Sequence, residues 1–221
     1  MTKIIMVRHG QSEANEQSRF AGHSDFDLTA LGRRQAQLAA EYLIKKEKVD
    51  VIYSSDLRRA HNTAEPFSRL YGLPINDTEG LRELFAGKWE GQRVVDLIEA
   101  YPEDMLRWRD DFSNARCTGG ESVAELYARM IPTVCALAEK NLGKTVLMTT
   151  HATPIRAIEC YSRGWGAERM ADVPFVKNSA ICIFEYDEAD KSIKAIKTDI
   201  VEHLDESLVT AVPSDLKTKV V

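Results

Sequence analysis

Short apolar stretches alternate with longer amphipathic stretches along this chain. The amphipathic segment Leu31–Lys46 places its apolar residues on one stripe at helical spacing, and Thr29 precedes it as a plausible N-cap. Strands are expected in four apolar stretches: Ile4–Val7, Val49–Tyr53, Val146–Thr150 and Ala180–Tyr186. The alternation predicts an α/β fold with a mostly parallel sheet that is buried on both faces.

Two segments depart from this alternation. Residues 84–120 form a less regular insert that carries two tryptophans, and it contains one predicted helix around Arg93–Arg109. We interpret the insert as a cap over the domain. The segment 205–221 is polar and interrupted by Pro213, so we expect a loosely held tail.

Length and charge narrow the classes of function. A chain of 221 residues suits one domain over 1–221, without metal or disulfide support. The 34 acidic and 29 basic side chains give a net charge of −5, and no basic block matches a nucleic-acid backbone. We expect no nucleic-acid partner, and binding of an anionic substrate requires a local basic pocket.

The cysteines and the apolar segments indicate where the protein works. The four cysteines are widely spaced and show no metal-binding pattern, so we expect buried free thiols: Cys117, Cys135, Cys160 and Cys182. No apolar stretch has the length of a membrane span or of a signal-peptide core. The sequence predicts a cytoplasmic protein with no membrane partner.

Three predicted strands end in cationic or imidazole side chains. Arg8 and His9 follow the first, Arg59 follows the second after a short loop, and His151 follows a later one. Ligands of open α/β sheets bind outside the carboxyl ends of the strands, so we expect these side chains to meet at one edge.

Such a set of side chains suits phosphoryl transfer. Arginine forks and imidazoles stabilise the charge on the oxygens of a phosphoryl group in transfer. A neutral histidine is a good nucleophile near pH 7, and nearby arginines favour its neutral form, so we predict His9 as the nucleophile. Glu83 is the predicted proton donor to the leaving oxygen, and afterwards the base for the attacking water.

A series of motifs in matching order resembles the histidine phosphatase superfamily, which includes the cofactor-dependent phosphoglycerate mutases. The first motif extends from Arg8-His9-Gly10 through Ser12 and Asn15 to Gly32. The others, in chain order, are Ser54-Ser55-x-x-x-Arg59-Ala60, Leu81-x-Glu83, Gly87-x-Trp89-Glu90-Gly91, Gly119-Gly120-Glu121-Ser122 and His151.

The resemblance implies a phosphoglycerate mutase-like three-layer α/β/α sandwich, a phosphohistidine intermediate and no metal requirement. For hydrolysis we expect no cofactor. By resemblance His9 is the nucleophile and Glu83 the proton donor. The catalytic group is completed by Arg8, Arg59 and His151. The expected substrate-binding set comprises Asn15, Ser12, Ala21, Gly22 and Ala152.

Two positions depart from the family pattern. The family usually has glycine after the second histidine, where this chain has Ala152, and many of its phosphatases have glutamine where this chain has Ala21. Both changes bear on the shape of the substrate pocket more than on the chemistry.

The remaining histidines and the tryptophans have simpler interpretations. His61 follows Arg59 on a predicted helix and is expected to point away from the site. His23 and His203 are interpreted as structural or surface residues, although His23 could line the pocket. Trp89 and Trp108 are interpreted as packing anchors of the insert, with substrate contact as the alternative.

Hydrolysis of a small phosphorylated metabolite is the leading hypothesis. A phosphoglycerate mutase is the second, with 2,3-bisphosphoglycerate as its cofactor. The short insert favours hydrolysis, whereas Arg107, Arg109 and Arg116 keep the mutase open. A catalytically silent phosphate-binding protein and a zinc hydrolase are further alternatives. A homodimer is the default expectation for the assembly.

Overall fold

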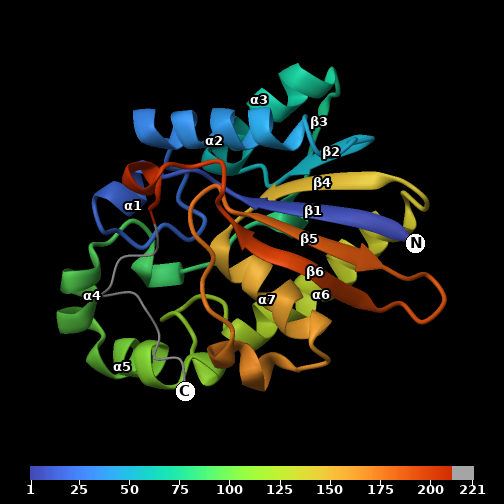
Figure 1. Cartoon of the computed structure of the whole chain (residues 1–221). Coiled ribbons are helices and arrows are strands. Elements are labelled where there is room, and N and C mark those ends of the chain that lie inside the picture. Colours follow the sequence, from blue (N-terminus) through green and yellow to red (C-terminus); the bar gives the residue numbers. More distant parts are fainter. Residues whose placement is uncertain (211–221) are drawn as a thin grey trace.

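A six-stranded sheet forms the centre of the fold. The computed structural model describes residues 1–210, and its strands are β1 (Thr2–Arg8), β2 (Val51–Ser54), β3 (Ile75–Asp77), β4 (Thr145–Thr150), β5 (Ile181–Tyr186) and β6 (Ile193–Ile200). They lie in the order β3-β2-β4-β1-β5-β6. The first four in this order pair in parallel, and β5 and β6 are antiparallel (Figure 1).

Helices cover both faces of this sheet. The helices of the described residues are α1 (Glu13–Glu16), α2 (Ala30–Leu43), α3 (Arg58–Tyr71), α4 (Val94–Ala100), α5 (Pro102–Asp110), α6 (Val123–Glu139) and α7 (Ala152–Ser162). Helices α2 and α3 lie on one face, and α6 and α7 lie on the other (Figure 1). The predicted three-layer α/β/α arrangement is confirmed.

The central strand β1 explains why the sheet is buried on both sides. Ile4 and Met6 belong to the apolar core on the side of α6 and α7, whereas Ile5 and Val7 belong to the core beneath α2. All four side chains are fully buried. Successive side chains of a strand point to opposite faces, so an unbroken apolar run predicts a strand of this kind.

The predicted elements are present with shifted boundaries. Strand β2 begins at Val51 and β5 at Ile181, each later than expected, and α2 ends at Leu43, before Lys46. Thr29 caps α2 as predicted, because its hydroxyl accepts a hydrogen bond from the Gly32 amide at 3.0 Å. Strands β3 and β6 were not predicted.

The insert contains two helices, so the prediction of one helix over Arg93–Arg109 was wrong. The break lies at Tyr101, whose φ of −136° and ψ of 57° are not helical. Pro102 follows it as the first residue of α5, and the residue before a proline is sterically pushed out of the helical region. Both helices lie beyond the carboxyl end of β1 (Figure 1).

The tryptophans of the insert anchor it to the core, as expected. Trp89 and Trp108 each contact the Phe20 ring edge-on, with ring centroids 5.2 Å and 5.1 Å apart. All three side chains belong to the same buried cluster as Ile4 and Met6 of β1. The insert is therefore continuous with the core of the domain.

The described part of the tail is held in place, which corrects the expectation for residues 205–210. Gln35 donates from Nε2 to the Leu208 carbonyl at 2.6 Å, and the Asn178 amide donates to the Thr210 carbonyl at 2.9 Å. The rest of the predicted tail, residues 211–221, lies outside the described residues.

The cysteines are free thiols, as predicted. Cys117, Cys160 and Cys182 are buried, and Cys135 is half-buried. Among residues 1–210, no helix combines the length and the apolar character that a membrane span requires.

Candidate active site

The carboxyl ends of β1, β2 and β4 bring the predicted site together. The amide of His9 donates to the Thr150 carbonyl at 2.9 Å, and the amide of Ser55 donates to the Thr149 carbonyl at 2.9 Å. These two bonds tie the ends of the three strands to one another. The rings of His9 and His151 meet there with centroids 5.2 Å apart.

Two glycines allow the loop after β1 to approach the start of α2. A Cβ atom on Gly10 would overlap the Gly32 carbonyl, so only glycine fits at this contact. The Gly10 amide donates to Oγ1 of Thr63 on α3 at 3.1 Å. The backbone next to His9 is thus held by both helices of this face.

The tautomer of His9 follows from its hydrogen bond. Its Nδ1 lies 2.7 Å from the carbonyl oxygen of Gly10. A carbonyl only accepts, so Nδ1 carries the proton and Nε2 keeps its lone pair. Burial, with Arg59 and Arg8 nearby, holds the pKa of His9 well below its usual range, so the ring is neutral at pH 7.

Arg8 and Arg59 are buried cations whose guanidinium groups are only partly paired. Arg8 donates from Nη1 to the Val176 carbonyl at 2.7 Å, and Arg59 donates to the carbonyls of Ser24 and Gly22 at 2.9 Å and 2.7 Å. Within the described part of the chain, the Nε of each arginine has no partner. Burial lowers the pKa of each to about 10, so both stay charged at pH 7.

His151 is a second neutral imidazole. Its Nε2 lies 2.8 Å from the hydroxyl of Ser55, and its Nδ1 has no partner among the described residues. The ring is fully buried, and this burial together with Arg59 and His9 holds its pKa well below the usual range. The free Nδ1 leaves one hydrogen-bonding position available to a ligand.

Glu83 lies at the cavity with its carboxyl group lightly held. Its Oε1 accepts from the Leu84 amide at 2.9 Å, and its Oε2 accepts from the Thr153 amide at 3.4 Å. Asn15 also lines the cavity, and its Oδ1 accepts from the side-chain amide of Asn178 at 3.2 Å.

A cavity of about 590 Å³, open to solvent, lies at this edge of the sheet, and the buried His151 lies behind the residues that line it. Its polar lining consists of Arg8, His9, Asn15, Arg19, Arg59, Glu83 and Thr153. The apolar part consists of Phe20, Leu84, Trp108 and Phe175, with Ala21, Gly22 and Ala152 beside them.

One predicted substrate-binding residue does not line this cavity. Ser12 is fully buried and is the N-cap of α1, where its hydroxyl accepts from the Asn15 amide at 3.3 Å. Its hydroxyl therefore satisfies the start of a helix, and substrate binding by Ser12 stays a prediction. The other four members of the predicted set, Asn15, Ala21, Gly22 and Ala152, do line it.

The remaining histidines lie outside the cavity lining. His61 pairs with Asp77 at 2.8 Å on an exposed surface, which agrees with the expectation. His23 contacts the Glu83 carbonyl through Nε2 at 2.8 Å, so it supports the backbone of a site residue. His203 is half-buried against the Tyr42 ring.

A comparison with protein families supplies the deciding observation. The model of the histidine phosphatase superfamily (branch 1) matches residues 4–199. The chain belongs to the histidine phosphatase superfamily.

Two relatives of this histidine phosphatase are phosphatases by name. The chain is 36% identical over 160 residues to phosphoserine phosphatase 1 of Hydrogenobacter thermophilus, a match that covers 72% of this chain and 75% of the relative. It is 42% identical over 163 residues to the glucosyl-3-phosphoglycerate phosphatase of Mycolicibacterium vanbaalenii, with 71% and 72% covered.

A solved structure agrees with these relatives. The mycobacterial glucosyl-3-phosphoglycerate phosphatase in complex with VO3 superimposes with a TM-score of 0.80 at 29% identity, over 90% of this chain and 97% of that structure. Together these findings make the chain a phosphoric monoester hydrolase of the histidine phosphatase superfamily.

Several residues at the site of this phosphatase were not predicted. Arg19 and Phe175 line the cavity, and Ser55 contacts His151. Ser55 lies within one of the family motifs, which was the available signal for it. Nothing in the local sequence marks Phe175, because it reaches the cavity through the tertiary fold alone.

Proposed function

We propose that this protein hydrolyses small phosphomonoesters through a phosphohistidine at His9. The observation that carries the proposal is a neutral imidazole, with Nδ1 held by the Gly10 carbonyl, beside two buried and charged arginines. A fixed lone pair on Nε2 attacks the phosphorus atom, and the bond to the leaving oxygen breaks. Preorganised positive charge stabilises the oxygens in transfer.

The arginines and His151 have complementary roles in this proposal. Arg8 and Arg59 hold the phosphoryl oxygens through their unpaired Nε groups. His151 donates from Nδ1 to another oxygen while the Ser55 hydroxyl occupies Nε2. Asn15 supports the bound group from the cavity wall. Each of these groups is buried or lines the cavity, and this supports the arrangement.

Glu83 completes the cycle in two steps. It first gives a proton to the leaving oxygen, which departs as an alcohol. It then takes a proton from the water that attacks phosphohistidine, which releases inorganic phosphate and restores both His9 and Glu83. The position of its carboxyl group at the cavity supports these roles.

The substrate class is a small phosphate ester that carries a second anionic group. Arg19 is a half-buried cation of the cavity lining and is separate in sequence from the phosphate-binding arginines. The relatives named for phosphoserine and glucosyl-3-phosphoglycerate act on esters that contain a carboxylate. We propose that Arg19 attracts such a carboxylate.

The mutase is the weaker alternative. The arginines that kept it open are all engaged elsewhere or exposed: Arg109 pairs with Asp110, Arg116 pairs with Glu125, and Arg107 is exposed. Among the described residues that line the cavity, none of these three is present. An arginine cluster from the insert therefore does not serve the substrate.

The net charge and the free cysteines support a proposal for the compartment and the partners of the enzyme. We propose a cytoplasmic enzyme that binds neither nucleic acid nor membranes, since its net charge is −5 and its cysteines are free. We also propose that it needs no metal, because a dication would be repelled by Arg8 and Arg59. A homodimer stays a prediction.

Phosphate release from a panel of phosphorylated metabolites in EDTA tests the proposal. The panel includes phosphoserine, and 3-phosphoglycerate with and without 2,3-bisphosphoglycerate. We expect release from at least one carboxylate-bearing ester, a loss of more than about a thousandfold in His9→Ala, and unchanged activity in His61→Ala. Rapid isomerisation of 3-phosphoglycerate with little free phosphate would instead support the mutase.

A further inference from the structure

An ion pair behind the cavity joins two segments that the catalytic scheme does not use. Glu121 belongs to the Gly119-Gly120-Glu121-Ser122 motif before α6, and Arg129 projects from α6. The Nε of Arg129 donates to Oε1 of Glu121 at 2.6 Å, and its Nη2 donates to Oε2 at 3.0 Å. This two-point contact fixes the plane of the guanidinium group.

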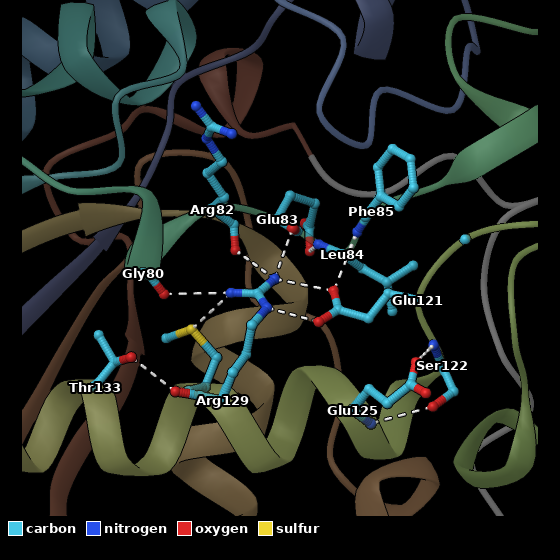
Figure 2. A network of polar contacts seen from close by, with 12 residues as sticks. Gly80, Arg82, Glu83, Leu84, Phe85, Glu121, Ser122, Glu125, Arg129 and Thr133 are labelled. Carbon is cyan, nitrogen blue, oxygen red and sulfur yellow. Dashed lines mark hydrogen bonds and ion pairs between the residues drawn. The ribbon is translucent and has the colours of Figure 1, made fainter.

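The same guanidinium group also binds three backbone carbonyls. Arg129 donates to the carbonyls of Gly80 at 3.2 Å, Arg82 at 3.0 Å and Glu83 at 2.8 Å. Figure 2 shows these contacts converging on the guanidinium group, while the side chain of Arg82 points away from it. Two of the three carbonyls belong to Glu83 or to its direct neighbour.

Glu121 holds the backbone on the other side of Glu83. The Phe85 amide donates to Oε2 of Glu121 at 3.1 Å (Figure 2). The Glu121 amide donates to the Phe85 carbonyl at 2.8 Å. Arg129 and Glu121 thus grip the chain before and after Glu83. We call this pair, with its contacts to residues 80–85, the clamp.

Glu83 depends on this clamp, with His23 as a further contact, because the Nε2 of His23 lies 2.8 Å from the same Glu83 carbonyl that Arg129 binds. Residues 82–86 belong to no helix and no strand, so no regular ladder holds their backbone. From the described residues, the Glu83 carboxyl group accepts hydrogen bonds only from the amides of Leu84 and Thr153. The bond from Thr153 is long, at 3.4 Å. The place of the carboxyl group is therefore set by the place of its backbone.

We propose that Arg129, locked by Glu121, is a positioning residue that sets Glu83 for proton transfer to the leaving oxygen. The inference rests on the proposed function, in which Glu83 is the proton donor. Arg129 does not line the cavity, so it touches neither substrate nor phosphate, and its hydrogen bonds reach the site through the backbone of Glu83. A small displacement of a catalytic group suffices to slow a reaction strongly.

The leaving group of the substrate distinguishes this role from a merely structural one. An alkyl phosphate such as phosphoserine expels a strongly basic alkoxide and needs a proton, whereas p-nitrophenyl phosphate expels a stable phenolate without help. The ratio kcat/KM reports the steps up to the first phosphoryl transfer. A displaced proton donor lowers kcat/KM for the alkyl ester selectively.

We expect Arg129→Met to lower kcat/KM for phosphoserine, or for the best alkyl ester of the panel, by about 10- to 100-fold. This loss is smaller than the full contribution of a proton donor, because Glu83 is displaced and not removed. The value for p-nitrophenyl phosphate should change by less than about threefold. Arg129→Lys keeps the charge but not the fork, so it should show a similar bias. Glu121→Gln keeps the side-chain shape and should show the same bias more weakly, which decides the matter if Arg129→Met fails to fold.

Two further variants separate the possible failures. Arg163→Met breaks a comparable ion pair with Glu159 away from the cavity and should show no bias between the two esters. Glu83→Gln should show the strongest bias. If Glu83→Gln lowers kcat/KM selectively for the alkyl ester and the folded clamp variants do not, the positioning role of the clamp is overturned and the proton-donor role of Glu83 stands. Equal losses on both esters in Glu83→Gln overturn the proton-donor role itself.

Discussion

Burial of His9 and His151 in neutral form has a consequence for stability. Both rings are buried, and burial holds the pKa of each well below 6.5, with Arg59 as a further cause in both. Between pH 6.5 and those lowered values, the unfolded chain binds protons that the folded chain does not. The free energy of unfolding therefore falls as the pH falls through this window.

Urea denaturation at pH 7, 6 and 5 measures this effect. Each histidine contributes a loss of up to about 1.4 kcal/mol per pH unit below 6.5. We expect His9→Asn, which has no titrating ring, to lose stability less steeply than the wild type by about that amount. His61→Asn, at a half-buried position outside the site, serves as the control. Parallel pH profiles for wild type and His9→Asn would contradict the neutral state of His9.

At the scale of residues, the sequence predicted those site groups that directly follow strands. His9, Arg8 and His151 lie at strand ends, so their meeting follows from the parallel sheet. The capping role of Ser12 was not predicted, because a capping serine and a ligand-binding serine look alike in sequence. Arg129 was missed because it acts on Glu83 from a helix 46 positions away, and only the fold brings them together.

At the scale of elements, the loop formed by residues 22–24 links the insert to the phosphate site. Glu90 accepts hydrogen bonds from the amides of His23, Ser24 and Ala86 and from the Ser24 hydroxyl, at 2.6–2.9 Å. Arg59 is held by the Gly22 and Ser24 carbonyls of that same loop. Gly22 has a φ of +48°, and a Cβ there would overlap the Glu90 carboxylate.

Loosening this loop should disturb Arg59 and the phosphate that it holds. Glu90→Gln replaces an acceptor of four hydrogen bonds with an amide that accepts on one side only. We expect a KM raised about tenfold and a loss of about 1–3 kcal/mol in stability. Steady-state kinetics and urea denaturation measure both, with the exposed Glu188→Gln as control. An unchanged KM would show that Arg59 does not depend on the loop.

Elements were predictable where periodicity was strong, but their boundaries were not. Strand β6 was missed because Ile193–Ile200 mixes lysines with isoleucines along a largely exposed edge of the sheet. Strand β3 has only three residues, too few for any pattern. The break between α4 and α5 was signalled by Pro102, which a purely periodic interpretation ignored.

At the scale of the whole molecule, a negatively charged chain concentrates positive charge at one sheet edge. The net charge is −5, yet the cavity lining includes Arg8, Arg19 and Arg59. The layers were predictable, because two-sided apolar strands need helices on both faces. The packing of the insert against the domain was not predictable, because its aromatic contacts with Phe20 join segments far apart in sequence.

The central claim is that His9 carries the phosphoryl group, and trapping that intermediate tests it most directly. Wild type and Glu83→Gln are mixed rapidly with p-nitrophenyl phosphate, whose leaving group needs no proton, and quenched in alkali, which preserves phosphohistidine. The phosphorylated peptide is located by mass spectrometry. We expect phosphate on the peptide that contains His9, at higher occupancy in Glu83→Gln because attack by water is slowed. Phosphate on another residue, or turnover that persists in His9→Ala, would contradict the account.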